Sequence, residues 1–386
     1  MLGPGPSGAE QAGAEQAAEE PSLAGVAAWR VERLHTATGT SVPFGAVPPD
    51  GVRFDERGRV YVVDTQAARV FVLEPDLTPR SSLGRRGRGP GEFTRPTLLA
   101  AGSDRVVVFD PGASRITLFD EGRPGWSVVW SIIERGVPQR LDLLDGDVVV
   151  EAKPLDIARV GEGDRTPGPG LFELRPDGSL RSLVTFDEPR ARGEPRSAAP
   201  VVFAPTTHWE VSDTGELLLS RTDRYLVEAM ARPPGPRRTR VERPGLEAAP
   251  VGPEMRERVR EVALRRYMEN RRQSALAEVD EVAMRGSVNA MEFAERLPLT
   301  GSVLALGTGS LLVQRGLGLV DGSAPGAPPP GLVSASWDVF DRSGARVGIA
   351  TFPDGFVPAD AHGDRVVGVR EGALGEVMVE VFRVSR

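Results

Sequence analysis

Three consecutive residues, His208, Trp209 and Glu210, bring an imidazole, an indole and a carboxylate together, and Tyr225 follows a short distance along the chain. A histidine beside a carboxylate can transfer protons near neutral pH, because the imidazole titrates at about pH 6.5. One hypothesis is therefore a hydrolase or lyase that uses His208 and Glu210. A single histidine next to a tryptophan is more often simply packed, so the other hypothesis is a binding site without catalysis.

The composition excludes several kinds of chemistry. The 386 residues include no Cys and three His, and Asn occurs only at positions 270 and 289. Disulfides, zinc–thiolate sites, iron–sulfur clusters and cysteine nucleophiles are therefore ruled out. A calcium site of the kind found in propeller lactonases would need Asn, Asp and Glu oxygens around a channel, and the two asparagines are badly placed for it. The G-x-S-x-G, H-E-x-x-H and phosphate-loop patterns do not occur. We expect no metal and no cofactor.

The elements that must position these residues follow a repeat. Asp64 and Arg69 recur as Asp110 and Arg115, an offset of 46 residues. Short apolar runs separated by turn residues predict four strands in each of the two copies. The predicted strands are 52–54, 60–63, 70–73 and 81–84, then 98–100, 106–109, 116–119 and 128–132. Four strands at this period are typical of propeller blades. A residue pair that recurs in successive blades favours a structural role over a catalytic one.

Weaker copies follow along the rest of the chain. They span residues 141–186, 209–241, 303–352 and 357–383, and the last copy is one strand short. Residues 29–35, WRVERLH, can supply the missing strand, which would remove an open edge. The sequence thus predicts an all-β fold, a six-bladed β-propeller of four-stranded antiparallel blades over residues 26–386, closed by an N-terminal strand.

Two segments do not follow the repeat. Residues 1–25 are mostly Gly, Ala, Pro, Glu and Gln, a composition that predicts a disordered leader. Residues 242–298 form an insert after the fourth blade, in which Pro253–Arg272 has an apolar stripe at helical spacing. A second helix is expected at 275–284 or at 289–296. The insert could simply pack across one end or the rim of the propeller, or could cap a central pocket or dock a partner.

One loop carries a family resemblance. GRRGRGPGEF at Gly84–Phe93, followed by Pro96, resembles the loop of the NHL-like six-bladed β-propeller family of environmental bacteria. The resemblance extends to RTDRYLVEAM at 221–230, MEFAERLP at 291–298 and WDVFDRSG at 337–344. It implies the propeller fold and says little about activity, since most members are uncharacterised. Members typically look exported, many with lipoprotein-like starts.

Propeller ligands usually lie at one mouth of the central channel, on the loops that enter the innermost strands and those joining the second and third strands. These loops carry aromatic and cationic side chains. We expect the ligand site to consist of His208, Trp209, Arg221, Arg224, Tyr225, Arg140 and Lys153. The favoured hypothesis is a non-enzymatic binding propeller, monomeric, with a protein, peptide or glycan partner at this mouth.

Nucleic acid is a further alternative, because some NHL propellers bind single-stranded RNA. The arginines at 85, 86 and 88 and at 237, 238 and 240 could form a basic face. The net charge of −7 and the three tyrosines available for stacking argue against it. As for compartment, the chain shows no signal peptide and no run of about 18 apolar residues that could span a membrane. The resemblance favours export if the N-terminus is truncated or processed, and a cytoplasmic location otherwise.

Overall fold

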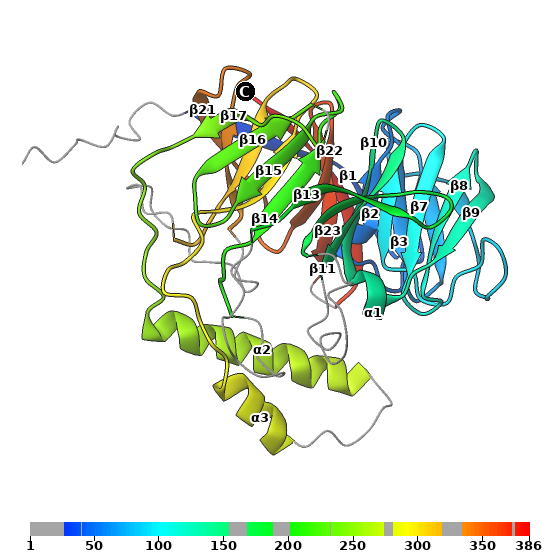
Figure 1. The fold of residues 1–386 in the computed structure, drawn as a ribbon, viewed down its shortest axis with the longest axis horizontal. Helices are drawn as coiled ribbons and strands as arrows, with labels where there is room; N and C mark the ends of the chain where they lie inside the picture. Colours follow the sequence, from blue (N-terminus) through cyan, green and yellow to red (C-terminus); the bar gives the residue numbers. More distant parts are fainter. Residues whose placement is uncertain are drawn as a thin grey trace, which may run out of the picture.

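The computed structural model describes residues 27–39, 41–153, 168–187, 201–231, 233–273, 281–318, 334–372 and 375–386. The expected leader, residues 1–25, lies outside this part of the chain. The fold consists mainly of β-strands, with two longer helices set apart from them (Figure 1). Among the described residues, no helix is both long and apolar enough to cross a membrane.

The strands form four-stranded antiparallel sheets from consecutive segments of the chain. The first sheet contains β2 (Val52–Phe54), β3 (Val60–Asp64), β4 (Arg69–Leu73) and β5 (Pro79–Leu83). The second contains β6 (Leu98–Ala101), β7 (Arg105–Asp110), β8 (Arg115–Asp120) and β9 (Arg123–Val129). The third contains β10 (Val137–Leu144), β11 (Asp147–Lys153), β12 (Gly170–Leu174) and β13 (Leu180–Thr185). The fourth contains β14 (Thr207–Val211), β15 (Leu217–Arg221), β16 (Leu226–Met230) and β17 (Arg238–Glu242).

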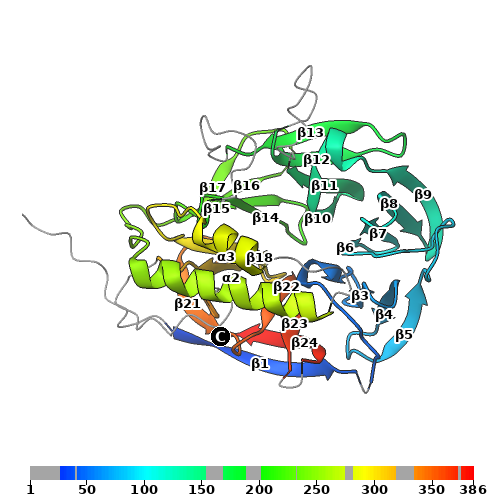
Figure 2. The ribbon, with the colours of Figure 1, turned by 90° about the horizontal axis from the view of Figure 1, so that it is seen from below.

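The remaining strands make one eight-stranded sheet in the order β18-β19-β20-β21-β1-β24-β23-β22. Its members are β18 (Thr300–Ala305), β19 (Leu311–Arg315), β20 (Ser336–Phe340), β21 (Arg346–Thr351), β1 (Ala27–Ala37), β22 (Val357–His362), β23 (Arg365–Glu371) and β24 (Val377–Ser385). The sheets follow one another around a ring, with β2, β6, β10, β14, β18 and β22 in contact around its centre (Figure 2). The arrangement is that of a β-propeller-like fold.

The N-terminal strand β1 joins the two halves of the eight-stranded sheet. Its residues 30–37 pair antiparallel with β24, and its residues 27–29 pair parallel with β21. The segment predicted to supply a strand to the last repeat therefore pairs with that repeat. Gly348 on β21 makes room for the Trp29 ring, since a Cβ at this position would lie 2.0 Å from Trp29 Cδ1.

The core lies between successive sheets, where apolar side chains from facing strands pack together. One cluster, for example, joins Val63 and Val70 of the first sheet to Leu99 and Val108 of the second. Strand alternation places these residues on the faces that meet, because successive side chains in a strand point to opposite sides.

The repeated aspartates have the structural role expected for them. Asp110 accepts hydrogen bonds from the backbone nitrogens of Thr94 (2.6 Å) and Arg95 (2.9 Å), and Asp64 does the same for Gly45 and Ala46. Each carboxylate thus fastens the loop that enters its own sheet. Arg115 donates to the carbonyl oxygens of Gly89 and Glu92, which holds the glycine-rich loop in place.

Two local predictions differ from the structure. The fourth strand of the second sheet was expected at 128–132 but covers Arg123–Val129, and Ile132–Arg135 form a short helix, α1. Ser131 favours this turn, because its Oγ accepts from the Glu134 nitrogen at 3.3 Å and caps the helix. In the insert, helix α2 covers Pro253–Gln273, close to expectation, whereas α3 covers Glu281–Asn289, which overlaps the end of the first range proposed and reaches the start of the second.

Helices α2 and α3 lie across one end of the ring, on the side of the fourth sheet and the eight-stranded sheet (Figure 1, Figure 2). The segment after α3 pairs with the segment that leads into β14. Val202 forms a β-bridge with Phe293, and the Val202 nitrogen donates to the Glu292 carbonyl at 2.8 Å. Arg256 and Arg260 of α2 stack on the same Phe293 ring. The insert therefore borders the end of the ring at which β14 begins.

Candidate functional site

Charged side chains from four of the innermost strands lie close enough to influence one another at the centre of the ring. They are Arg53 on β2, Arg140 and Asp142 on β10, Glu210 on β14 and Asp360 on β22. The negative charges of Asp142 and Asp360 raise the pKa of Glu210, although β10, β14 and β22 do not pair with one another. These carboxylates therefore approach one another from different sheets.

Arg140 makes the most contacts within this central cluster. Its Nη2 donates to the Glu210 carboxylate and, at 3.2 Å, to Asp142 Oδ2. Its Nη1 donates to the backbone carbonyl of Trp209, and its guanidinium lies 4.8 Å from the centre of the Trp209 ring. Burial opposes the charge of Arg140, but the two carboxylates outweigh it and raise the pKa of the guanidinium further. Arg140 thus links the third sheet to the fourth with its charge retained.

Two carboxylates of the cluster, unlike the Arg140 guanidinium, are shifted by burial towards their neutral form. Burial raises the pKa of Glu210 to about 8, with Asp360 and Asp142 adding to the rise and Arg140 opposing it. Burial also raises the pKa of Asp360 to about 6, while Arg53 and the backbone nitrogens of Phe54 and Ala361 oppose the change. Three carboxylates thus share two guanidinium groups, so the cluster can hold a proton at neutral pH.

His208 lies next to this cluster and is neutral at pH 7. Burial lowers its pKa to about 4, and the charges of Arg140 and Lys153 lower it further. A neutral imidazole has one donor and one acceptor nitrogen. His208 and Glu210 lie two residues apart on β14 and so share one face of the strand, whereas Trp209 points to the other.

Trp209 itself belongs to the core between the third and fourth sheets. Its side chain is 2% exposed, and its Nε1 donates to Glu151 Oε2 at 2.8 Å. Lys153, two residues after Glu151 on β11, has its Nζ 3.8 Å from Glu151 Oε1. The structure thus brings four of the expected site residues together, namely His208, Trp209, Arg140 and Lys153. Of these, Trp209 is a core residue, and the Arg140 guanidinium packs on its ring.

The side chains of the other three expected residues do not join this group, although Arg221 lies opposite Thr207, the neighbour of His208. Arg221, at the end of β15, makes two hydrogen bonds to Asp223, at 2.9 and 2.8 Å. Arg224 is exposed on the following turn. Tyr225 is buried between the fourth sheet and the eight-stranded sheet, where its hydroxyl donates to Asp338. Its ring therefore presents no surface to a partner in this structure.

Sequence reasoning missed Asp142, Asp360 and Arg53 as members of the cluster. Each lies on the first strand of its repeat, and this shared position is the signal that could have identified them. Arg53 is 3% exposed and donates to the carbonyl oxygens of Val52 (2.8 Å) and Ala359 (3.1 Å), so it connects β2 to β22.

Within the described part of the chain, no group of three or more His, Asp or Glu residues could hold a metal ion. The three histidines lie apart: His35 is on β1, His208 is the second residue of β14, and His362 ends β22 with its Nδ1 3.7 Å from Asp213 Oδ1.

The two arginine groups considered for nucleic acid are largely engaged within the protein. Arg237 pairs with Glu228 at 2.9 Å, and both Arg238 and Arg240 pair with Glu216. In the other group, Arg85 pairs with Glu92 at 2.8 Å. These pairs neutralise much of the positive charge on which a nucleic-acid surface would depend.

No protein-family model matches the sequence, and no curated protein matches it. Solved structures do resemble the fold. A candidate exported protein from Bacteroides fragilis has a TM-score of 0.53 at 7% identity, over 93% of this chain and 96% of the other. A member of the DUF4221 family from Bacteroides vulgatus has a TM-score of 0.55 at 10% identity, over 94% and 98%. At these identities the likeness shows the fold alone.

Proposed function

We propose that this chain is a six-bladed propeller that binds a partner at one mouth of its central channel. The blade count is supported by the six innermost strands in contact around the centre. The eight-stranded sheet then represents two blades, β18–β21 and β22–β24 with β1, and β1 closes the ring by completing the second of these. Membership of the NHL-like family is part of the same proposal and is supported by the GPGEF loop at 89–93.

The observation that carries the binding proposal is the central charged cluster together with His208 beside it. His208 contributes a neutral donor and acceptor, while Glu210 and Arg140 contribute a carboxyl and a guanidinium beside it. Buried polar groups of this kind cost folding free energy, and the charges here come from four separate sheets. A partner that hydrogen-bonds at this mouth would make use of them. The partner is a protein, peptide or glycan, and the α2–α3 insert borders its binding surface.

Binding to glycan and peptide arrays, with affinities measured for each hit, tests this proposal. His208→Ala should weaken binding of a genuine ligand by about tenfold or more, because it removes one well-placed hydrogen-bonding group. His35→Ala is the matched control, since it makes the same substitution on β1 and should leave affinity unchanged. A hit that binds both variants as tightly as the wild type does not use this mouth.

A hydrolase or lyase that uses His208 and Glu210 is the second candidate, and the raised pKa of Glu210 favours it. Burial raises this pKa to about 8, so at pH 7 the Glu210 carboxyl holds a proton that it can donate to a substrate. His208 is neutral beside it and can accept a hydrogen bond, although a pKa of about 4 makes it a weak base. A substrate panel with His208→Ala and Glu210→Gln separates the two functions. Turnover that survives both substitutions would remove this candidate.

We also propose export from the cytoplasm. The likeness in fold to a candidate exported protein supports it, as does the NHL-like resemblance. Fractionation of cells that express the complete gene product tests the proposal, because an exported protein should be recovered outside the cytoplasmic fraction.

A further inference from the structure

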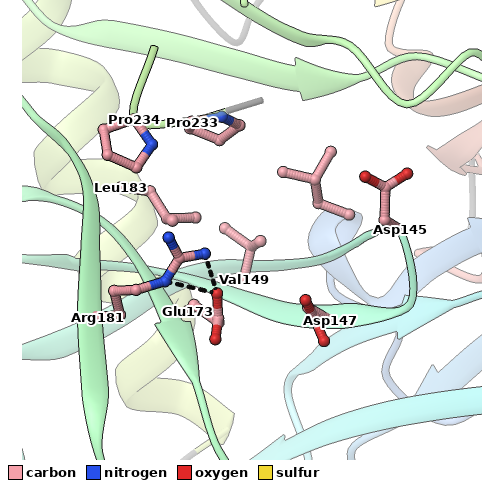
Figure 3. A pocket seen from close by; sticks show the side chains of 9 residues that line it. Asp145, Asp147, Val149, Glu173, Arg181, Leu183, Pro233 and Pro234 are labelled. Atoms are coloured by element: carbon pink, nitrogen blue, oxygen red, sulfur yellow. Dashed lines mark hydrogen bonds and ion pairs between the residues drawn. The ribbon is translucent and has the colours of Figure 1, made fainter. Parts of the chain in front are cut away.

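A cavity of about 400 Å³ lies between the third sheet and the connection from β16 to β17 (Figure 3). Its charged lining does not indicate a ligand. Glu173 accepts hydrogen bonds from both Arg175, at 3.1 Å, and Arg181, at 2.9 Å. Asp145 and Asp147 are exposed on the β10–β11 turn. Among the described residues that line this cavity, no buried hydrogen-bonding group therefore lacks a partner.

Two side chains of β14 differ in this respect. The Glu210 side chain is 3% exposed; its Oε2 accepts from Arg140, whereas its Oε1 has no hydrogen-bond partner among the described residues. The half-buried His208 likewise has no partner there for either ring nitrogen. Polar groups of this kind cost free energy when they are buried without a partner. A ligand that hydrogen-bonds to both would recover this cost.

The surroundings of these two groups favour a ligand without charge. At neutral pH the three carboxyl groups of the central cluster hold one proton and so balance its two guanidinium groups, and His208 is neutral. Farther out, Lys153 lies 3.8 Å from Glu151, and the charge of the exposed Asp50 acts on His208 and Arg140. A cationic ligand would meet the guanidinium groups and Lys153, and an anionic ligand would meet the carboxylates.

The hydroxyl groups of a sugar match what the two side chains offer. Because Glu210 Oε2 accepts from Arg140, a proton on this carboxyl lies on Oε1, where it can be donated to a ligand. The neutral imidazole of His208 adds one donor and one acceptor, and a sugar hydroxyl can pair with either, because it both donates and accepts. The two residues lie roughly 7 Å apart along the strand, a distance that one sugar residue can span.

The two ends of the ring differ in how the turns beside the innermost strands are joined. His208 is the second residue of β14, at the end that the insert borders. At the opposite end, His362 Nδ1 on β22 lies 3.7 Å from Asp213 Oδ1 on the β14–β15 turn. Between them, the Gly307 nitrogen donates to the Gly363 carbonyl at 2.7 Å. Turns from three repeats thus contact one another there, so a ligand approaches from the end at which β14 begins.

We propose that the ligand at the channel mouth is a neutral sugar, bound as one residue of a glycan, an inference that rests on the binding function proposed above. One sugar hydroxyl accepts from the Glu210 carboxyl, and a second forms a hydrogen bond with the His208 ring. Arg140 is a positioning residue, because it holds the other oxygen of Glu210.

Nuclear magnetic resonance and calorimetric titration of the full chain with the methyl glycosides of glucose, galactose and mannose test the proposal. We expect at least one of them to bind saturably, with an affinity that does not change with salt, because no net charge takes part. The corresponding glycosides of the uronic acid, which is an anion, and of the 2-amino sugar, which is a cation, should bind at least about tenfold more weakly.

Substitutions on β14 connect this binding to the site. His208→Ala should weaken binding of the neutral glycoside about tenfold or more, and the matched control His35→Ala should leave it unchanged. Glu210→Asp, which withdraws the carboxyl by one methylene group, should also weaken binding about tenfold. Glu210→Gln should weaken it less than Glu210→Asp, because the amide keeps a neutral donor at the same distance from the backbone.

Three results would overturn the proposal: binding of a charged glycoside as tight as that of the neutral one, equal binding by the wild type and His208→Ala, or no binding of any neutral glycoside. Failure of the channel-mouth function would look different. If a peptide binds and His208→Ala weakens it, the mouth is a binding site and only the sugar is wrong. If neither sugar nor peptide binding depends on His208, the proposed function fails as well.

Discussion

The indole nitrogen of Trp209 donates a hydrogen bond to Glu151 Oε2 at 2.8 Å, which connects the first strand of the fourth sheet to the second strand of the third. The contact lies inside an otherwise apolar interface formed by residues such as Val149 and Leu219. On the strand, Trp209 separates His208 from Glu210. The residue that anchors β14 in the core therefore also sets the position of the two residues that face the proposed ligand.

Trp209→Phe should destabilise the protein by removing this hydrogen bond and part of the ring volume. Trp337→Phe is a matched control, because Trp337 is equally buried and its Nε1 has no hydrogen-bond partner among the described residues. We expect Trp209→Phe to lower the free energy of unfolding by about 1–2 kcal/mol more than Trp337→Phe. Urea denaturation measures the difference. Equal losses would show that the hydrogen bond contributes nothing beyond packing.

The protein should lose stability between about pH 6.5 and 8.5. Burial raises the pKa of Glu210 to about 8, so the folded state keeps a proton that the unfolded chain has released. Folding then takes up a proton, and the stability gained from it disappears as pH rises through 8. The expected loss is roughly 1–2 kcal/mol over this range, seen in denaturation curves at each pH. Glu210→Gln, which cannot ionise, should flatten the profile.

Two histidines also contribute to the pH dependence of stability and must be distinguished from Glu210. The pKa of His208 is lowered to about 4, so its contribution to stability rises with pH between about 4 and 6.5. In that range it offsets the fall from Glu210, which begins near the ordinary pKa of 4.5, and above pH 6.5 only the fall from Glu210 remains. The contact with Asp213 raises the pKa of His362, and this contribution also falls as pH rises. The double variant His362→Gln and Glu210→Gln should therefore be flatter than either single variant. A Glu210→Gln profile parallel to the wild type would contradict the raised pKa.

Gly348→Ala should be strongly destabilising. The new Cβ would lie 2.0 Å from Trp29 Cδ1 and 2.7 Å from the Ala27 carbonyl oxygen, so β1 would have to move. Gly286→Ala, within α3, is the matched control, since a Cβ there meets nothing within 4 Å. It should stabilise the protein slightly, by up to about 1 kcal/mol, because alanine is the better helix former. Similar melting temperatures for the two variants would show that Trp29 does not pack as described.

Removal of β1 should damage the fold, whereas removal of the predicted leader should not. Deleting residues 1–24 is expected to leave the melting temperature unchanged. Deleting residues 1–37 removes β1, one of the two partners of β24, and exposes an unpaired strand edge, which favours aggregation. Yield of monomer in size-exclusion chromatography and thermal unfolding report the difference. A stable, monomeric product of the longer deletion would contradict closure of the ring by β1.

The sequence predicted the strands well because the repeat made each of them visible more than once. The match of Asp64 to Asp110 and of Arg69 to Arg115 placed two whole sheets, and an apolar stripe placed α2. The short helix α1 was missed because Ser131 acts as a cap through a local hydrogen bond that strand patterning does not reveal. The need for glycine at Gly348 could not be predicted either, because it depends on the contact with Trp29, a residue more than 300 positions earlier in the chain.

The site was harder to predict, because it depends on which residues meet across the ring. Asp142, Glu210 and Asp360 lie on strands far apart in the sequence, and only the circular arrangement brings them together. Strand alternation could have shown that Trp209 faces away from His208. Tyr225 was expected at the ligand, but its distant partner Asp338 holds it between two sheets, a contact that no local pattern indicates.

Hydrogen–deuterium exchange of the wild-type protein, with and without a glycan or peptide that binds it, tests the central claim most directly. If the partner binds at the channel mouth, amides of residues 137–144 and 207–211 should become protected on binding, together with those of the insert near 292–294. Unchanged exchange in β10 and β14 at saturating ligand would contradict the proposed site.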